Sequence, residues 1–343
     1  MTETRRGAAA ESRSAAELRD GAEIDDGAAA LAALRSGGKP SLARALSRLE
    51  SRSGAAETLA LLDAAWAAPL GPAIALTGPP GVGKSTLIDA LIRAQRAQGG
   101  TIGVIAVDPS SSRTGGALLG DRTRLSTDPE DDGVFVRSMA ARDRLGGLAD
   151  HAYPASVLMR ATRDLTLIET VGVGQSETDA AEIADAAVFC VQPASGDSLQ
   201  FMKAGVMEIP DLVLVTKADL GEIARRAAAD AAGALSLAAR DGPPPPVRLV
   251  SAAEGPEGRT VREALEAMAA IALARRTRAR RAAQVEAHIR QGLKARFGTA
   301  GLAALGPLAP LEGAALDKRP FTWAARAEAR LAETFEALAA RWR

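Results

Sequence analysis

The sequence is poor in several residue types, and each shortage excludes a class of function. Cys190 is its only cysteine, so neither an internal disulfide nor a cysteine-cluster metal site can form. Lys and Arg number 42 against 42 Asp and Glu, so no global field recruits nucleic acid or an acidic membrane surface. Because no uncharged apolar run reaches the roughly 18 residues of a membrane span, and no secretory apolar core is present, we expect a cytoplasmic protein.

Aromatic residues make up only 3% of the chain, whereas alanine and aliphatic residues are plentiful. This composition favours helices packed closely on a sheet. Cys190 lies within the apolar run Ala187–Val191, which is typical of a buried strand. A free cysteine in such a run usually packs in the core, so we expect a buried thiol and not a reactive one.

The apolar pattern divides the chain into four parts. Residues 1–38 are rich in Ala, Gly and charged residues, which predicts a flexible tail. Residues 39–70 carry apolar residues at helical spacing on both sides of Gly54, which predicts two amphipathic helices. Residues 71–256 alternate strands with helices, and residues 257–343 are helical and form a candidate dimerisation region.

Strand–helix alternation predicts an α/β fold with a doubly wound, mostly parallel sheet, flanked by helical N- and C-terminal extensions. The predicted strands are Ala73–Thr77, Ile102–Val107, Val134–Arg137, Leu165–Glu169, Ala187–Gln192, Leu212–Thr216 and Val247–Val250. The predicted helices among them are Lys84–Arg96, Tyr153–Thr162, Leu199–Val206 and Leu220–Ala238.

A dense basic cluster lies in the C-terminal helical region, at Arg275, Arg276, Arg278, Arg280 and Arg281. We expect it to form a solvated helix face. A docking surface for an acidic partner is the alternative. Nucleic acid is disfavoured as a partner because no aromatic residues are interleaved with the arginines.

The strongest motif is a phosphate-binding loop of the pattern G-x-x-x-x-G-K-[ST], formed by Gly78, Pro79, Pro80, Gly81, Val82, Gly83, Lys84, Ser85 and Thr86. It follows an apolar strand and opens a helix, as its mechanism requires. The backbone N–H groups surround a phosphate, and the helix N-terminus favours its negative charge. Lys84 can reach the β- and γ-phosphates, and the Ser85 hydroxyl can ligate Mg²⁺. The motif therefore predicts a P-loop nucleotide hydrolase.

Two acidic residues end predicted strands and point to the same edge of the sheet. Asp108 and Glu169 are candidates to hold the metal or its waters, the alternative being solvated strand-end acids. The run Glu169–Gly172 has the shape of a nucleotide-sensing turn, in which the Gly172 N–H contacts the γ-phosphate. Lys84, Glu169 and Gly172 are therefore the candidate catalytic residues. Val173 stands where some nucleotide hydrolases place a water-orienting Gln, which predicts slow unassisted hydrolysis.

A base-binding motif follows a later strand. Thr216, Lys217 and Asp219 form Thr-Lys-x-Asp, close to the guanine motif Asn-Lys-x-Asp. The Asp219 carboxylate can accept from guanine N1–H and the exocyclic amine, whereas adenine N1 would repel it. A helix cap at Asp219 is the alternative. The turn Ser251-Ala252-Ala253 resembles one that contacts guanine O6, and the pair favours guanine over adenine.

These motifs and the segments between them resemble the methylmalonyl-CoA mutase-associated GTPases, the MeaB/ArgK/MMAA family. The resemblance covers roughly Leu42–Ala253. It rests on the segments Val107–Ser111, Arg113–Gly116, Leu119–Arg124, Glu169–Glu177, Ser195–Gln200 and Gly205–Ile209. Thr216 stands where the family usually has Asn.

The resemblance implies a GTP-binding and GTP-hydrolysing chaperone of an adenosylcobalamin-dependent acyl-CoA mutase of the methylmalonyl-CoA mutase type. Such a chaperone assists cofactor loading and protects the mutase from inactivation. The resemblance also implies a GTP/GDP cycle with Mg²⁺, a phosphate contact from Lys84, and a homodimer formed through C-terminal helices. The implied surroundings of Mg²⁺ are Ser85, Asp108, Asp121 and Glu169.

Three other functions are weighed against this one. A nickel-type metal-insertion GTPase needs a His-rich tract or a Cys pair, whereas this chain has only His151, His288 and Cys190. A signal-recognition-type targeting GTPase commonly carries Thr-Lys-x-Asp, but its sensing turn is usually Asp-Thr-Ala-Gly. A nucleotide-dependent scaffold with negligible turnover is the non-enzymatic alternative.

Overall fold

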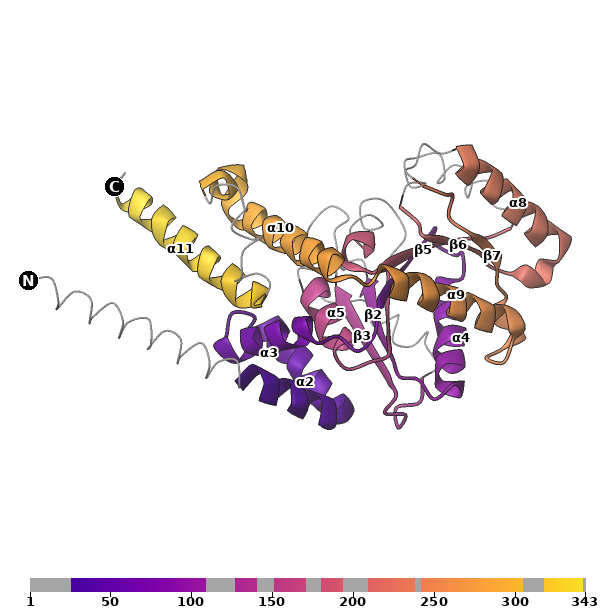
Figure 1. Ribbon diagram of the computed structural model, residues 1–343, viewed down its shortest axis with the longest axis horizontal. Helices are drawn as coiled ribbons and strands as arrows, with labels where there is room; N and C mark the ends of the chain where they lie inside the picture. The colour runs from indigo at the N-terminus through magenta and orange to yellow at the C-terminus, as the bar shows by residue number, and fades with distance from the viewer. Residues whose placement is uncertain are drawn as a thin grey trace, which may run out of the picture. The chain divides into compact units, whose positions relative to one another are not determined.

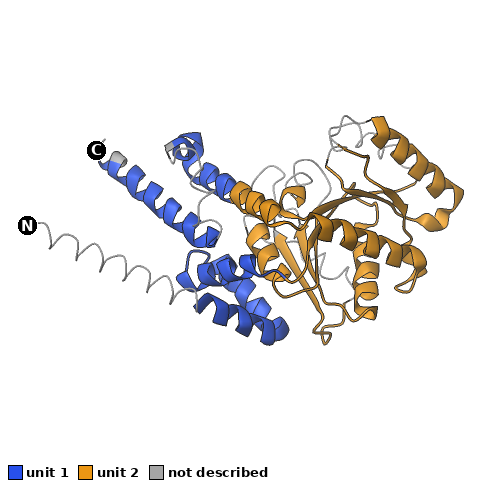
Figure 2. Cartoon of the chain, viewed as in Figure 1, with its two compact units in different colours: residues 1–69, 289–343 blue, residues 70–288 orange. Residues whose placement is uncertain are grey.

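The computed structural model describes residues 26–108, 127–140, 151–170, 180–193, 209–237, 242–304 and 318–341, drawn as coloured ribbons in Figure 1. The chain divides into two compact units, shown in Figure 2. Residues 70–288 form the larger unit, and residues 1–69 with 289–343 form the smaller one. Across the described ranges, no helix is both long and apolar enough to cross a membrane.

The larger unit is built on a seven-stranded sheet in the order β3-β2-β4-β1-β5-β6-β7 (Figure 1). Its strands are β1 (Ala73–Thr77), β2 (Ile102–Asp108), β3 (Val134–Ala140), β4 (Leu165–Glu169), β5 (Ala186–Val191), β6 (Leu212–Val215) and β7 (Val247–Leu249). Each described pairing is parallel, which confirms the predicted fold class and all seven predicted strands. The carboxyl ends of the strands therefore meet at one edge, where open parallel sheets bind ligands.

Helices cover both faces of this sheet. Helices α4 (Lys84–Ala97) and α9 (Arg259–Arg275) pack on one face, and α5 (Ala152–Arg160) and α8 (Glu222–Leu237) pack on the other. The predicted helix over Leu199–Val206 lies outside the described residues.

Strand β5 shows why both faces need cover. Val188 and Cys190 belong to the core under α4 and α9, whereas Phe189 and Val191 pack with α8. Cys190 is fully buried, and burial raises the pKa of its thiol to about 12. The expectation of a core cysteine is confirmed.

The smaller unit is helical. It contains α2 (Gly38–Ser51), α3 (Ala56–Ala67), the end of α10 (Arg278–Ala304) and α11 (Pro320–Arg341). The two helices predicted on either side of Gly54 are thus present as α2 and α3. Residues 26–36 are also helical, although they lie within the predicted tail, because Leu31 and Leu34 are buried one helical turn apart.

A buried carboxylate joins α3 to the first turn of α11. Asp63 accepts hydrogen bonds from the backbone N–H groups of Phe321 (2.8 Å) and Thr322 (3.2 Å), and from the Thr322 hydroxyl (2.6 Å). It therefore caps a helix more than 250 residues away in sequence. Burial raises the pKa of this carboxyl to about 6, against the opposing effect of the hydrogen bonds.

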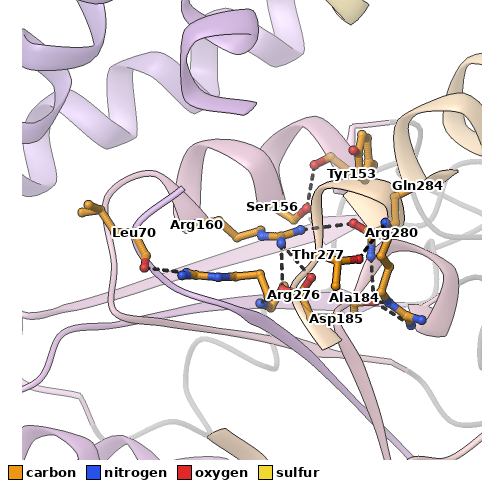
Figure 3. Close-up of polar contacts among 11 residues, drawn as sticks. Leu70, Tyr153, Ser156, Arg160, Ala184, Asp185, Arg276, Thr277, Arg280 and Gln284 are labelled. Atoms are coloured by element: carbon orange, nitrogen blue, oxygen red, sulfur yellow. Dashed lines mark hydrogen bonds and ion pairs between the residues drawn. The ribbon is translucent and has the colours of Figure 1, made fainter. Parts of the chain in front are cut away.

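A buried ion pair lies at the amino ends of strands β1 and β5 (Figure 3). Arg160, at the end of α5, donates to both carboxylate oxygens of Asp185, at 2.8 and 2.7 Å. Asp185 also accepts from the backbone N–H of Ala73, the first residue of β1. A second Arg160 nitrogen donates to Gln284 of α10 at 3.3 Å. The pair thereby joins two helices to the central strands.

The arginine cluster contributes to the same region. Arg276 donates to the carbonyl of Leu70 at 2.7 Å, and Arg280 donates to that of Ala184 at 3.1 and 3.3 Å (Figure 3). Arg275 pairs with Asp211 at 3.2 Å. The expectation of a solvated face is therefore wrong for Arg276 and Arg280, which are partly buried and fasten the start of the C-terminal helices to the sheet. Arg275 is exposed, as expected.

Candidate functional site

The phosphate-binding loop connects β1 to α4 and has a backbone that requires glycine. Gly78, Gly81 and Gly83 have φ angles of 140°, 76° and 95°, which side-chain-bearing residues rarely adopt. A Cβ on Gly78 would lie 2.3 Å from the carbonyl oxygen of Cys190, so neighbouring strand β5 also excludes any side chain there. The loop leads into α4, whose first-turn N–H groups have no helical partner and favour an anion.

Lys84 holds its ammonium group against this loop. Its Nζ donates to the carbonyls of Gly78 (2.6 Å) and Pro79 (3.1 Å), and the residue is buried. The positive charge is thereby kept at the loop. The structure thus places Lys84 where the sequence predicted a phosphate-binding cation.

Ser85 and Glu169 come together from different elements. The Ser85 hydroxyl, in the first turn of α4, donates to a carboxylate oxygen of Glu169 at 2.8 Å. Glu169 ends β4 and pairs with Leu76 of β1, so its buried side chain lies beside the start of the phosphate loop. Thr170 continues this connection, since its hydroxyl donates to that of Thr77 at 3.1 Å.

The other predicted metal and sensing residues are described less fully. Asp108 ends β2 two residues beyond Ala106, which pairs with Glu169, so its backbone lies at the same edge of the sheet. Its side chain is not among those described. Asp121 and Gly172 lie outside the described residues.

The Ser85–Glu169 pair has the chemistry that Mg²⁺ requires. Mg²⁺ takes oxygen ligands, and in nucleotide sites it is held by one or two protein oxygens together with phosphate and water. The Ser85 hydroxyl and a Glu169 carboxylate oxygen lie 2.8 Å apart beside the phosphate loop and supply two such protein oxygens. The residues present therefore fit this ion.

The two base-site motifs also come together. The Ser251 hydroxyl donates to a carboxylate oxygen of Asp219 at 2.6 Å, and the Ala218 N–H donates to the carbonyl of Val250 at 3.1 Å. Ser251 is fully buried, and its N–H donates to the hydroxyl of Thr260 at 3.0 Å. Ser251 therefore orients the Asp219 carboxylate. Asp219 does not cap the short helix η2 (Ala218–Leu220), because the N-cap residue of that helix is Lys217. Ala252 and Ala253 follow in the short helix η3 (Ala252–Glu254).

Thr216 connects the base motif to the phosphate loop. Its hydroxyl lies 2.8 Å from the carbonyl oxygen of Val82 and 3.1 Å from that of Val191. The next residue, Lys217, has a φ of 54°, the only positive value at a described residue other than glycine. Its Nζ donates to Gln192 at 2.6 Å. Sequence reasoning missed Gln192, whose one available signal was its place as the polar last residue of a predicted apolar strand.

The sequence of this chain is similar to that of known GTPases. The chain matches the family model described as methylmalonyl Co-A mutase-associated GTPase MeaB over residues 42–301. A protein of Pyrococcus abyssi named as a GTPase is 51% identical over 147 residues, which are 43% of this chain and 45% of that protein. The mitochondrial methylmalonic aciduria type A homolog of Mus musculus is 43% identical over 176 residues, 50% of this chain and 42% of that protein. The matches thus span less than half the length of these relatives.

A solved structure extends the comparison to most of the chain. The crystal structure of a LAO/AO transport system kinase superposes with a TM-score of 0.58 and 26% sequence identity. The superposition covers 90% of this chain and 97% of that one. This agreement supports the P-loop α/β architecture seen in the larger unit.

Proposed function

The chain belongs to the family of methylmalonyl-CoA mutase-associated GTPases, and we propose that it binds and hydrolyses GTP as the chaperone of an acyl-CoA mutase. One observation carries the guanine assignment: Ser251 holds Asp219 at 2.6 Å, beside a strand end that Thr216 ties to the phosphate loop. The carboxylate of Asp219 would accept from guanine N1–H and the exocyclic amine. Adenine, which has an acceptor at N1, would be repelled.

Lys84 and the loop amides would bind the β- and γ-phosphates. Ser85 and Glu169 would hold Mg²⁺, with Asp108 and Asp121 as further members of its surroundings; when bound, the ion neutralises phosphate charge. The Gly172 N–H would contact the γ-phosphate. These groups position and stabilise charge, and none supplies an obvious base, so the chain alone should hydrolyse GTP slowly.

The partner assignment rests on the family. Its description names methylmalonyl-CoA mutase, and the mouse relative is named for methylmalonic aciduria. We propose an adenosylcobalamin-dependent mutase of this type as partner, assisted in cofactor loading and protected from inactivation. The same proposal places the protein in the cytoplasm. It also includes a GTPase domain at residues 71–256 and a homodimer formed through residues 257–343.

Single-turnover GTP hydrolysis tests this proposal, measured with the full chain alone and with each acyl-CoA mutase of the host. The correct mutase should accelerate hydrolysis, because a group supplied or ordered in trans can contribute roughly 10³–10⁵-fold. A pull-down with and without GTP provides an independent readout. If no mutase binds or changes the rate, the chaperone role is excluded. Negligible turnover of GTP under all these conditions would instead support a scaffold.

A further inference from the structure

The hydroxyl of Thr216 is already engaged with the protein. It lies within hydrogen-bond distance of two backbone carbonyls, 2.8 Å from that of Val82 in the phosphate loop and 3.1 Å from that of Val191 at the end of β5. The Thr216 N–H also donates to the Val191 carbonyl, at 2.8 Å. Thr216 itself is buried. It therefore joins β5, β6 and the phosphate loop at one point.

The number of protons on this side chain decides what else it can do. A hydroxyl has one donor, and either carbonyl uses it. An Asn amide has two donors, so it can bond to the protein and still donate to an acceptor of the nucleotide. The relevant acceptor is N7, which guanine presents on the edge opposite N1. Thr216 has no proton left for it.

The neighbouring lysine is held in the same way. Lys217 adopts a left-handed backbone conformation, and its ammonium group is directed to Gln192 at 2.6 Å. Asp219 is fixed by Ser251. Each side chain of the base motif thus has a defined protein partner, and only the Asp219 carboxylate has the chemistry to read the N1 edge of guanine.

We propose that Thr216 is a positioning residue that ties the base motif to the phosphate loop, and that this protein reads guanine without a side-chain hydrogen bond to N7. The inference rests on the proposed guanine-nucleotide function. Thr216 then contributes to nucleotide affinity by aligning the base motif with the phosphate loop, and not by contacting the base. Discrimination against adenine then depends on Asp219.

Nucleotides with and without N7 provide the test. Calorimetric titration compares GTP and GDP with 7-deaza-GTP and 7-deaza-GDP, in which a C–H replaces N7. The unmodified chain should bind GTP and 7-deaza-GTP within about threefold of one another, because no side-chain donor loses its partner when a C–H replaces N7. Thr216→Val keeps the side-chain shape, removes the donor and leaves a buried carbonyl unpaired. It should weaken both nucleotides by the same factor, roughly tenfold.

Two further variants separate positioning from contact. Thr216→Ser keeps the hydroxyl and should bind like the parent. Thr216→Asn supplies a second donor and should create a preference for GTP over 7-deaza-GTP that the parent lacks. Circular dichroism establishes that each variant is folded. The comparison of GTP with 7-deaza-GTP on the unmodified chain does not depend on the folding of any variant.

Several outcomes would overturn the inference. One is a parent that binds GTP more than about threefold more tightly than 7-deaza-GTP, with Thr216→Val abolishing the difference, because Thr216 would then contact the base. Another is a folded Thr216→Val variant with parental affinity, because the tie would then have no effect. A chain that binds no guanine nucleotide would instead defeat the proposed function itself.

Discussion

The hydroxyl of Ser85 donates to a carboxylate oxygen of Glu169 across 2.8 Å, joining the first turn of α4 to the end of β4. If this pair holds Mg²⁺, Glu169→Gln should raise the Mg²⁺ concentration needed for half-maximal GTP hydrolysis by about tenfold, because the amide keeps the shape and loses the charge. Hydrolysis rates across a Mg²⁺ titration measure this. An unchanged Mg²⁺ requirement would leave Glu169 as a strand-end acid only.

Lys84 should contribute mainly through the phosphates. Lys84→Ala removes a charged donor from the loop and should weaken GTP binding by roughly 10–100-fold, while binding of guanosine, which has no phosphate, should change little. Fluorescence titration measures both affinities. Lys294→Ala, at an exposed position of α10, is the matched control and should bind like the parent. Equal losses for GTP and guanosine would point to a collapsed loop and not to a lost phosphate contact.

The Arg160–Asp185 pair should be a major contributor to stability. Both side chains are almost fully buried, at 3% and 0% exposure, so Asp185→Ala would leave an unpaired buried charge and lower the free energy of unfolding by about 3–5 kcal/mol. The exposed pair Arg225–Glu222 is the control. Glu222→Ala should cost less than about 1 kcal/mol. Urea unfolding compares the two variants, and similar losses would contradict the structural role of the buried pair.

Asp63 should make stability depend on pH. Its pKa in the folded chain, about 6, lies above the ordinary value of 3.8, so the folded state holds this proton more tightly than the unfolded state does. The stabilisation by protonation is fully present below about pH 3.8 and is lost as pH rises through about 6. The free energy of unfolding should therefore fall between these pH values.

Asp63→Asn removes the titration, because the amide cannot ionise, and it keeps one acceptor oxygen, which can serve either Phe321 or Thr322. Urea unfolding of parent and variant at several pH values between 4 and 7 gives the difference. Parallel pH profiles for the two proteins would show that Asp63 does not titrate in this range.

The sequence predicted the sheet and the phosphate loop because both depend on local residue types. A buried parallel strand is a short continuous apolar run, and the loop needs glycine at Gly78, Gly81 and Gly83. The proximity of Asp219 and Ser251 followed from strand order, since both lie just beyond strand ends in one parallel sheet. These features required no knowledge of distant contacts.

Other features could not be predicted because their partners are remote or carry no side-chain signal. Arg276 and Arg280 bond to backbone carbonyls, which any residue could supply. Asp63 caps a helix from the far end of the chain. The roles of Asp121 and Gly172 remain predictions, because these residues lie outside the described ranges.

Guanine selectivity is the property on which the proposed function depends most directly. Calorimetric titration of the parent and of Asp219→Asn with GTP, ATP and XTP measures it. The parent should bind GTP at least about 10³-fold more tightly than ATP, because adenine would place an acceptor against the Asp219 carboxylate that Ser251 holds. Asp219→Asn should lose GTP affinity and gain affinity for XTP, whose base has an acceptor where guanine has its amine. Comparable affinities of the parent for GTP and ATP, or a variant with unchanged preference, would contradict a guanine site at Asp219.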